Sequence, residues 1–237
     1  MFDRYERQVK IKEIGEDGQK KLLDSKVLVV GAGGLGSPAI YYLAAAGIGN
    51  IGICDDDTVT LSNLNRQILH FEKDIDYKKT DSAREKIALF SSDVEIQTYD
   101  FKIDDRNSEE LFKKYDIVLS CVDNFDARNV LNRAHIETKK PLIDAGVNGF
   151  SGYVFPIINN FPCYNCVYPK NLSSANTDNG IIGATAGVVG SMQALEAIKT
   201  ILGLNIENYG HMVFIDLLYS SIQRIKISKN ESCACNK

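Results

Sequence analysis

The stretch VLVVGAGGLGSP, residues 27–38, constrains the fold most, because it joins an apolar run to a helical segment through closely spaced glycines. Gly31, Gly33 and Gly36 match a GxGxxG pattern, and Asp55 follows Gly36 by 19 residues at the end of the next apolar run. Glycines allow a tight turn and let phosphate approach backbone N–H groups, while a carboxylate placed there accepts from ribose hydroxyls. The motif predicts a nucleotide site without identifying the nucleotide. A merely tight strand-to-helix turn is the alternative.

Apolar runs bounded by turn residues alternate with segments of helical period over the first 150 residues. This alternation is typical of βαβ units in a mostly parallel sheet. Beyond residue 150, a segment of alternating polarity indicates an antiparallel strand, and two further strands follow a long helix. We therefore predict an α/β fold in which antiparallel C-terminal strands extend a parallel sheet. The expected strands are 26–31, 50–55, 94–102, 116–123, 141–146, 151–158, 211–218 and 221–228, and the expected helices are 35–47, 80–92, 108–115, 127–139 and 185–203.

Length and charge exclude several classes of protein. A chain of 237 residues fits one α/β domain, so we expect a single domain over 1–237. The 27 Lys and Arg residues against 31 Asp and Glu give a net charge of −4, and no basic field is expected to attract nucleic acid. No apolar run approaches the ~18 residues that span a bilayer, and the N-terminus lacks an apolar signal segment. These features predict a cytoplasmic protein with no nucleic-acid or membrane partner.

The cysteines are clustered in a way that favours metal over disulfides. Cys163 and Cys166 form CxxC in a polar loop of ~20 residues, a length that usually marks a functional loop. Cys233 and Cys235 form CxC in the tail, 67 residues beyond Cys166. Four thiolates can close a tetrahedral structural zinc site, although CxC separates its two ligands by one residue where the usual second CxxC separates them by two. Free or redox-active thiols remain the alternative.

Three polar residues follow Asp55, the carboxylate expected to bind a ribose, and could reach past the ribose to phosphate oxygens. Asn63 and Arg66 lie three residues apart and share one side of a helical turn, and Lys79 begins the next helix. Reaction at a triphosphate needs cations around the developing charge, whereas a dinucleotide pyrophosphate is commonly held by backbone. Arg66 and Lys79 could equally be solvated surface residues, as most Lys and Arg are.

Asp123 follows the expected strand 116–123, and ligands gather at the carboxyl ends of parallel strands. A carboxylate opposite bound phosphates is a natural Mg²⁺ ligand. The alternative role is an N-cap for the helix that follows, since Asp is a preferred capping residue. The two roles are compatible.

Taken together, these segments resemble the ThiF/MoeB/HesA adenylyltransferases, bacterial relatives of the ubiquitin-activating enzymes. The resemblance runs through RYERQ, VGAGGLGSP, DDDTVTLSNLNRQILH, DIVLSCVDN, PCYNCVYP, GVVGSMQALEAIK and the tail cysteines, with a lean toward the ThiF branch. It implies a Rossmann-like ATP-binding fold, with a nucleotide-binding half over 1–150 and a carrier-binding, zinc-containing half over 151–237. The implied reaction is ATP-dependent adenylation of the C-terminal Gly-Gly carboxylate of a ubiquitin-like sulfur carrier, for thiamin or molybdenum-cofactor synthesis.

The resemblance also implies roles for individual residues. MgATP would lie over the glycine turn (Gly31, Gly33, Gly34 and Gly36), with Asp55 on the ribose, and Asp123 would bind Mg²⁺. Asn63, Arg66 and Lys79 would surround the triphosphate. Arg7 is similar to the arginine that family members insert into the partner subunit's site, which implies a homodimer; an exposed charge beside a helix is the alternative.

Two positions depart from the family pattern. Asn176 stands where many relatives have a loop cysteine, so a separate persulfide donor is expected to supply sulfur rather than a covalent enzyme–carrier link. Lys78 stands where relatives often have proline, which leaves the choice between Lys78 and Lys79 open. The competing functions are adenylation of a peptide or a tRNA base, an NAD-dependent oxidoreductase, and a non-catalytic scaffold for a carrier protein.

Overall fold

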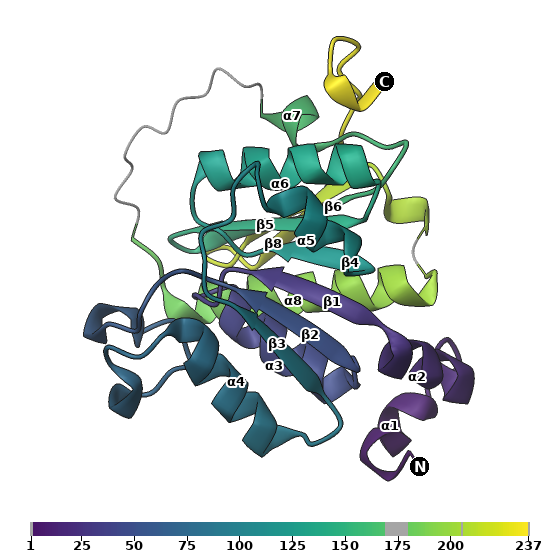
Figure 1. The fold of residues 1–237 in the computed structure, drawn as a ribbon. Coiled ribbons are helices and arrows are strands. Elements are labelled where there is room, and N and C mark those ends of the chain that lie inside the picture. Colours follow the sequence, from purple (N-terminus) through teal and green to yellow (C-terminus); the bar gives the residue numbers. More distant parts are fainter. Residues whose placement is uncertain (1, 169–179, 205, 237) are drawn as a thin grey trace.

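A single eight-stranded sheet runs through the molecule, with helices on both faces (Figure 1). The computed structural model describes residues 2–168, 180–204 and 206–236. The strand order is β3-β2-β1-β4-β5-β6-β7-β8. The strands are β1 (Lys26–Val30), β2 (Asn50–Cys54), β3 (Glu95–Tyr99), β4 (Ile117–Ser120), β5 (Leu142–Asn148), β6 (Ser151–Ile157), β7 (His211–Asp216) and β8 (Ser221–Lys226).

The first five strands pair in parallel, and β6, β7 and β8 extend the sheet in antiparallel pairs. This arrangement confirms the predicted fold class. The antiparallel extension follows from the tight link between β5 and β6, where Asn148 pairs with Ser151. So short a link has no room for the crossover that a parallel pair needs.

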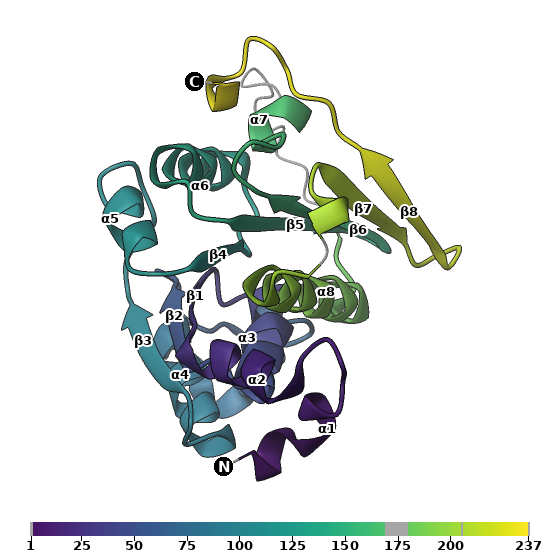
Figure 2. The ribbon, with the colours of Figure 1, turned by 90° about the vertical axis from the view of Figure 1, so that its right-hand side faces the viewer.

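Helices on the two faces of the sheet bury two separate apolar clusters (Figure 2). One face carries α2 (Gly15–Asp24), α3 (Gly36–Ala46), α4 (Lys79–Phe90) and α8 (Gly183–Leu202), and the other carries α5 (Ser108–Lys113) and α6 (Phe125–Thr138). The central strands are apolar on both sides because both faces are covered. In β1, for example, Val27 to Val30 are all buried.

Chain order creates a crevice at the carboxyl ends of the strands. The chain moves outward from β1 to β2 and β3, then crosses back to β4 on the other side of β1. At such a switch point the loops after β1 and β4 diverge and leave an opening. The glycine turn follows β1, and Asp123 follows β4, so the fold brings these two candidates to the same opening.

Several elements differ from the sequence prediction. The short helices α1 (Glu6–Val9) and α7 (Tyr164–Val167) were not predicted, nor was α2, whose sequence GEDGQKKLLD contains two glycines and few apolar residues. The described part of the long loop is α7 and its flanks; Asn176 lies outside the described residues. None of the helices in the described ranges combines the length and hydropathy that a bilayer span requires.

Candidate active site

A pocket of about 920 Å³ occupies the crevice at the carboxyl ends of the strands. Its walls come from the glycine turn, the ends of β2 and β4, the segment after β3, and the antiparallel strands β6 and β7. Both halves of the chain therefore line one continuous pocket.

The glycine turn is tight enough to require glycine at two positions. Gly31 has a φ of +100°, and a Cβ there would lie 2.5 Å from the carbonyl oxygen of Cys121. At Gly36 a Cβ would lie 2.0 Å from the carbonyl oxygen of Gly31, because the helix α3 starts directly against the turn. Side chains are thus excluded at both positions. Gly31 lines the pocket, as phosphate binding at a backbone turn requires, whereas Gly36 is buried and is not among the described residues of the lining. Gly33 and Gly34 line the pocket in the same turn.

Asp55 anchors the turn from the end of β2. Its carboxylate accepts hydrogen bonds from the N–H of Ala32 (2.7 Å) and of Asp57 (2.9 Å). Burial raises the pKa of Asp55, and Lys79 and the two N–H donors offset part of this increase. The carboxylate thus faces the pocket beside the turn, where it can accept from a ribose.

Lys79 is a pocket residue, whereas Lys78 is not. The side chain of Lys79 is 6% exposed, and its ammonium lies 2.7 Å from Asp57 and 4.0 Å from Asp55. Lys78 points elsewhere and pairs with Asp100, with 43% of its side chain exposed. A solvated role for Lys79 is therefore wrong, and the geometry favours Lys79 over Lys78 as the cation for a bound phosphate.

Arg66 and Asn63 lie on the same turn but differ in position. Arg66 lines the pocket against Gly34, and its guanidinium donates to the Ser62 carbonyl and to Asn65 Oδ1, both at 2.9 Å. The Asn63 carboxamide instead accepts from the N–H of Thr60 (3.2 Å) and caps a short 3₁₀ turn. Among the described residues, those lining the pocket do not include Asn63. Its side chain would have to leave the cap to reach a phosphate.

Asp123 is exposed at the mouth of the pocket, where its carboxylate accepts from Asn124 Nδ2 (3.3 Å). The N-cap of α6 is Asn124, which accepts from the N–H of Ala127 (2.9 Å). The alternative role of Asp123 as the capping residue is therefore wrong. Its oxygens remain open toward the pocket and suit a hard cation such as Mg²⁺.

A buried polar network, which the sequence did not reveal, supports the glycine turn from behind. His70 Nε2 lies 2.9 Å from the carbonyl of Ala32, and its Nδ1 lies 2.8 Å from Ser82 Oγ. Ser82 also contacts Asp74 and Lys86, which pair with each other. Because a carbonyl only accepts, Nε2 carries the proton. The backbone of Ala32 is thus held on both sides of its Cα, by Asp55 at the N–H and by His70 at the C=O.

We expect the free energy of unfolding to fall as pH drops below about 6.5, and His70→Gln to reduce that fall. Burial lowers the pKa of His70, with Lys79 and Lys86 adding to the effect, while Ala32 and Asp74 oppose it. The unfolded chain therefore binds a proton that the folded chain excludes, which favours unfolding at acid pH. Glutamine retains an N–H donor but does not titrate.

The measurement is denaturant unfolding of both proteins at several pH values from about 5.5 to 7.5, around the ordinary histidine pKa. The prediction is contradicted if the free energy of unfolding depends equally on pH in the wild-type protein and in His70→Gln. Some slope should persist because burial also lowers the pKa of His135.

A second buried group was also missed from the sequence. Arg128 of α6 donates to the carbonyls of Val122 (2.8 Å) and Ala145 (2.9 Å), and its Nε lies 3.3 Å from Asp144 Oδ1. Tyr153 of β6 donates to the other Asp144 oxygen at 2.8 Å. These contacts join α6 to the segment after β4, to β5 and to β6, and Arg128 and Tyr153 also line the pocket.

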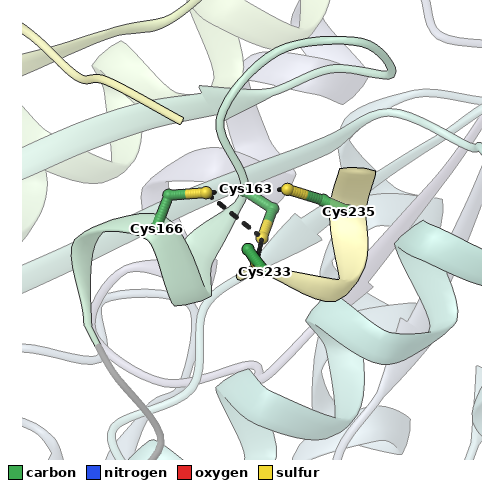
Figure 3. A group of neighbouring side chains, drawn as sticks. All are labelled: Cys163, Cys166, Cys233 and Cys235. Atoms are coloured by element: carbon green, nitrogen blue, oxygen red, sulfur yellow. Dashed lines mark hydrogen bonds between the residues drawn. The ribbon is translucent and has the colours of Figure 1, made fainter. Parts of the chain in front are cut away.

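The four candidate metal ligands converge, with all four sulfur atoms within 4.8 Å of one another (Figure 3). The Sγ separations are 4.0 Å for Cys163–Cys166, 3.4 Å for Cys163–Cys233 and 3.6 Å for Cys166–Cys235. Four thiolates at ~2.3 Å around a tetrahedral zinc would be ~3.8 Å apart. The cluster therefore fits a closed four-sulfur site, which leaves no position for substrate.

Arg7 lies on α1, which packs on α2 by the amino end of β1 (Figure 1). Its side chain is exposed. Of the residues that the structure describes, those that line the pocket do not include Arg7. Within one chain Arg7 therefore contributes nothing to the pocket, and a role in catalysis would require a second copy.

The profile of the ThiF family matches residues 5–236. The chain belongs to the ThiF family. It is 40% identical to the adenylyltransferase and sulfurtransferase MOCS3 of Culex quinquefasciatus over 98% of this chain and 55% of the relative. It is 34% identical to the sulfur carrier protein adenylyltransferase of Thermus thermophilus, over 98% of this chain and 89% of that protein. The chain thus spans about half the length of the MOCS3 relatives and most of the Thermus one.

Solved structures agree with the ThiF assignment at the level of the fold. E. coli MccB superposes with a TM-score of 0.83 at 22% identity, over 98% of this chain and 72% of that one. At this identity the similarity describes the fold alone, and it includes the antiparallel half of the sheet because nearly the whole chain is covered.

Proposed function

We propose that the chain catalyses ATP-dependent adenylation of the C-terminal Gly-Gly carboxylate of a small ubiquitin-like sulfur carrier. The observation that carries this proposal is that one pocket gathers the glycine turn, a buried lysine and an open carboxylate at Asp123. A relative named sulfur carrier protein adenylyltransferase, aligned over 89% of its length, supports the same acceptor. The product then serves sulfur transfer in thiamin or molybdenum-cofactor synthesis.

In this function the nucleotide lies over β2, β1 and β4. Asp55 accepts from the ribose, and the phosphates lie over the turn, where Gly31, Gly33 and Gly34 line the pocket and Gly36 keeps the turn tight. Lys79 and Arg66 lie at the phosphate end, and Asn63 joins them if its cap opens. Lys79 now pairs with Asp57, so a triphosphate would replace this carboxylate as its partner.

The reaction is attack by an acceptor carboxylate oxygen on the α-phosphorus of ATP. An oxygen–phosphorus bond forms, the bond to the bridging oxygen breaks, and its electron pair leaves with pyrophosphate. Asp123 would hold Mg²⁺, which supplies positive charge against the phosphate oxygens. The protein itself performs no covalent step, so its contribution is positioning and charge neutralisation.

Further parts of the proposal concern assembly and metal. Residues 1–150 form the nucleotide-binding half of one domain, and residues 151–237 form the half that binds the carrier and holds zinc through Cys163, Cys166, Cys233 and Cys235. A homodimer would allow Arg7 of one protomer to reach the pocket of its partner. A separate persulfide donor then attacks the acyl carbon of the adenylate, an acyl–sulfur bond forms, and AMP leaves with the electron pair of the acyl–oxygen bond.

The test is ATP–pyrophosphate exchange by the purified protein with a panel of carrier proteins ending in Gly-Gly. Exchange that depends on one carrier supports the proposal and identifies the pathway. Folded protein that shows no exchange with any carrier, but does exchange with a peptide, would favour a peptide acceptor instead.

Lys79→Met should reduce kcat/KM for exchange by about 10²-fold, because it removes the buried cation beside the phosphate position. Methionine keeps the linear stem and so preserves packing. Lys78→Met is the matched control from the adjacent position, and it should stay within about twofold since the Lys78–Asp100 pair is exposed. Equal reductions of kcat/KM in the two variants would contradict the placement of Lys79 beside the phosphates.

A further inference from the structure

The cysteine cluster and the pocket share one short segment of chain. The helix α7 has four residues, too few to be stable without external support. Cys163 is its N-cap and Cys166 lies within it, and their thiols meet Cys233 and Cys235 of the C-terminal tail (Figure 3). The conformation of α7 therefore depends on the link between its cysteines and the tail.

The opposite side of the same segment forms a wall of the pocket. Tyr164 is 1% exposed, Tyr168 follows the helix, and both line the pocket with their ring centroids 4.9 Å apart. The Tyr168 ring also packs on Tyr153 of β6 at 6.2 Å and on Phe125 of α6 at 6.1 Å. Each cysteine of α7 is thus one or two residues from an aromatic ring of the wall.

The wall lies in the part of the pocket that a nucleotide over β2 and β1 leaves open. Asp55 and Lys79 hold the nucleotide over β2 and β1, whereas the aromatic rings contact α6 and β6 beyond β4. An acceptor that reaches the phosphates beside Asp123 therefore passes the rings of Phe125 and Tyr168. A flat aromatic surface suits a narrow tail of small residues, which presents peptide planes without side chains.

One buried side chain connects the cluster to the wall. Asn132 of α6 is fully buried, donates through Nδ2 to Cys163 Sγ (3.7 Å), and accepts at Oδ1 from the N–H of Tyr164 (3.0 Å). Outer-shell donors of this kind orient metal ligands. The same carboxamide thus fixes the metal ligand and the first ring of the wall.

We infer that Tyr164 and Tyr168 are positioning residues for the C-terminal tail of the acceptor, and that the four-cysteine metal site holds them in place. The acceptor depends on the proposed function, whereas the link between metal and wall stands on geometry alone. The nucleotide residues on β1, β2 and α4 lie outside this link. Metal occupancy therefore controls acceptor affinity and leaves ATP affinity unchanged.

The first experiment follows the wall directly. The chain contains no tryptophan, so Tyr168→Trp introduces a unique fluorescent reporter. Removing zinc with a chelator should increase acrylamide quenching of the introduced indole, and adding zinc back should reverse the change. Hydrogen exchange of residues 160–168 in the unmodified protein should rise on chelation, while exchange of β1 and β2 stays unchanged.

The second experiment separates acceptor from nucleotide. Chelation, and Cys235→Ser, should each raise KM for the carrier that supports exchange about tenfold, a loss typical of a buried aromatic contact. The dissociation constant for ATP alone, by calorimetry, should change by less than about twofold. Tyr168→Ala should raise KM for the carrier to the same extent in zinc-loaded protein. Tyr168→Phe should keep the wild-type KM because the aromatic ring is retained.

Each outcome decides between the alternatives. A metal site with only a structural role would weaken ATP and carrier binding together, or would leave the reporter unchanged on chelation, and either result overturns the inference. If no carrier supports exchange, the proposed function fails, while the reporter and hydrogen-exchange measurements still test the link between metal and wall.

Discussion

Asp123→Ala should reduce ATP–pyrophosphate exchange by about 10³-fold or more while leaving the fold intact. The carboxylate is exposed at the mouth of the pocket, after the strand β4 and opposite the glycine turn. Removing it takes away the ligand proposed for Mg²⁺, so charge on the leaving pyrophosphate loses its main compensation. Because the hydrogen bond from Asn124 is the one that its carboxylate receives from the described residues, stability should change by less than about 0.5 kcal/mol.

The matched control for this prediction is Asp126→Ala, three residues along the chain. Asp126 is exposed in the first turn of α6, where it interacts with the helix dipole but does not line the pocket. It should retain exchange activity and lose at most about 1 kcal/mol of stability. Steady-state exchange at varied Mg²⁺ and circular dichroism of both variants provide the measurement. Exchange near the wild-type rate in Asp123→Ala would contradict the assignment of Asp123 as the ligand for Mg²⁺.

Local sequence predicted the features that depend on local geometry. The spacing of Gly31 and Gly36 predicted a tight turn between a strand and a helix. The structure has this turn, and a Cβ at either glycine would approach a backbone carbonyl oxygen too closely. The buried strands were equally clear, since Val27 to Val30 of β1 and Ile117 to Leu119 of β4 form continuous apolar runs. The CxxC and CxC pairs also predicted a cluster, and the fold brings the four thiols within 4.8 Å.

Features that depend on tertiary register were not predictable in this way. Asn63 and Arg66 have helical spacing, yet the Asn63 carboxamide is used by a 3₁₀ cap and only Arg66 lines the pocket. His70 reaches Ala32 across 38 residues, a contact with no local pattern. Tyr164 and Tyr168 lie in a polar loop of the sequence and carry no local pattern that indicates a place in the pocket wall. Long-range contacts of this kind depend on where α4, α6 and α7 pack.

Arg128→Met should destabilise the protein by about 3–5 kcal/mol, because it leaves the Asp144 carboxylate buried without its cation. Asp144 is 1% exposed, and Arg128 also satisfies the carbonyls of Val122 and Ala145. Methionine fills a similar volume, so the loss reflects charge and hydrogen bonding rather than a cavity. Denaturant unfolding of the variant against the wild-type protein measures it.

The pH dependence of this loss identifies its cause. Burial raises the pKa of Asp144, and Arg128 offsets part of the increase, so removing Arg128 raises that pKa further. A carboxyl group with a raised pKa binds its proton more tightly in the folded state, which makes stability fall as pH rises above the ordinary value near 4. The cost of Arg128→Met should therefore be smaller at acid pH than at neutral pH. Arg128→Met combined with Asp144→Leu should recover part of the stability, and a cost independent of pH and of Asp144 would show that the two carbonyl contacts, rather than the ion pair, account for the loss.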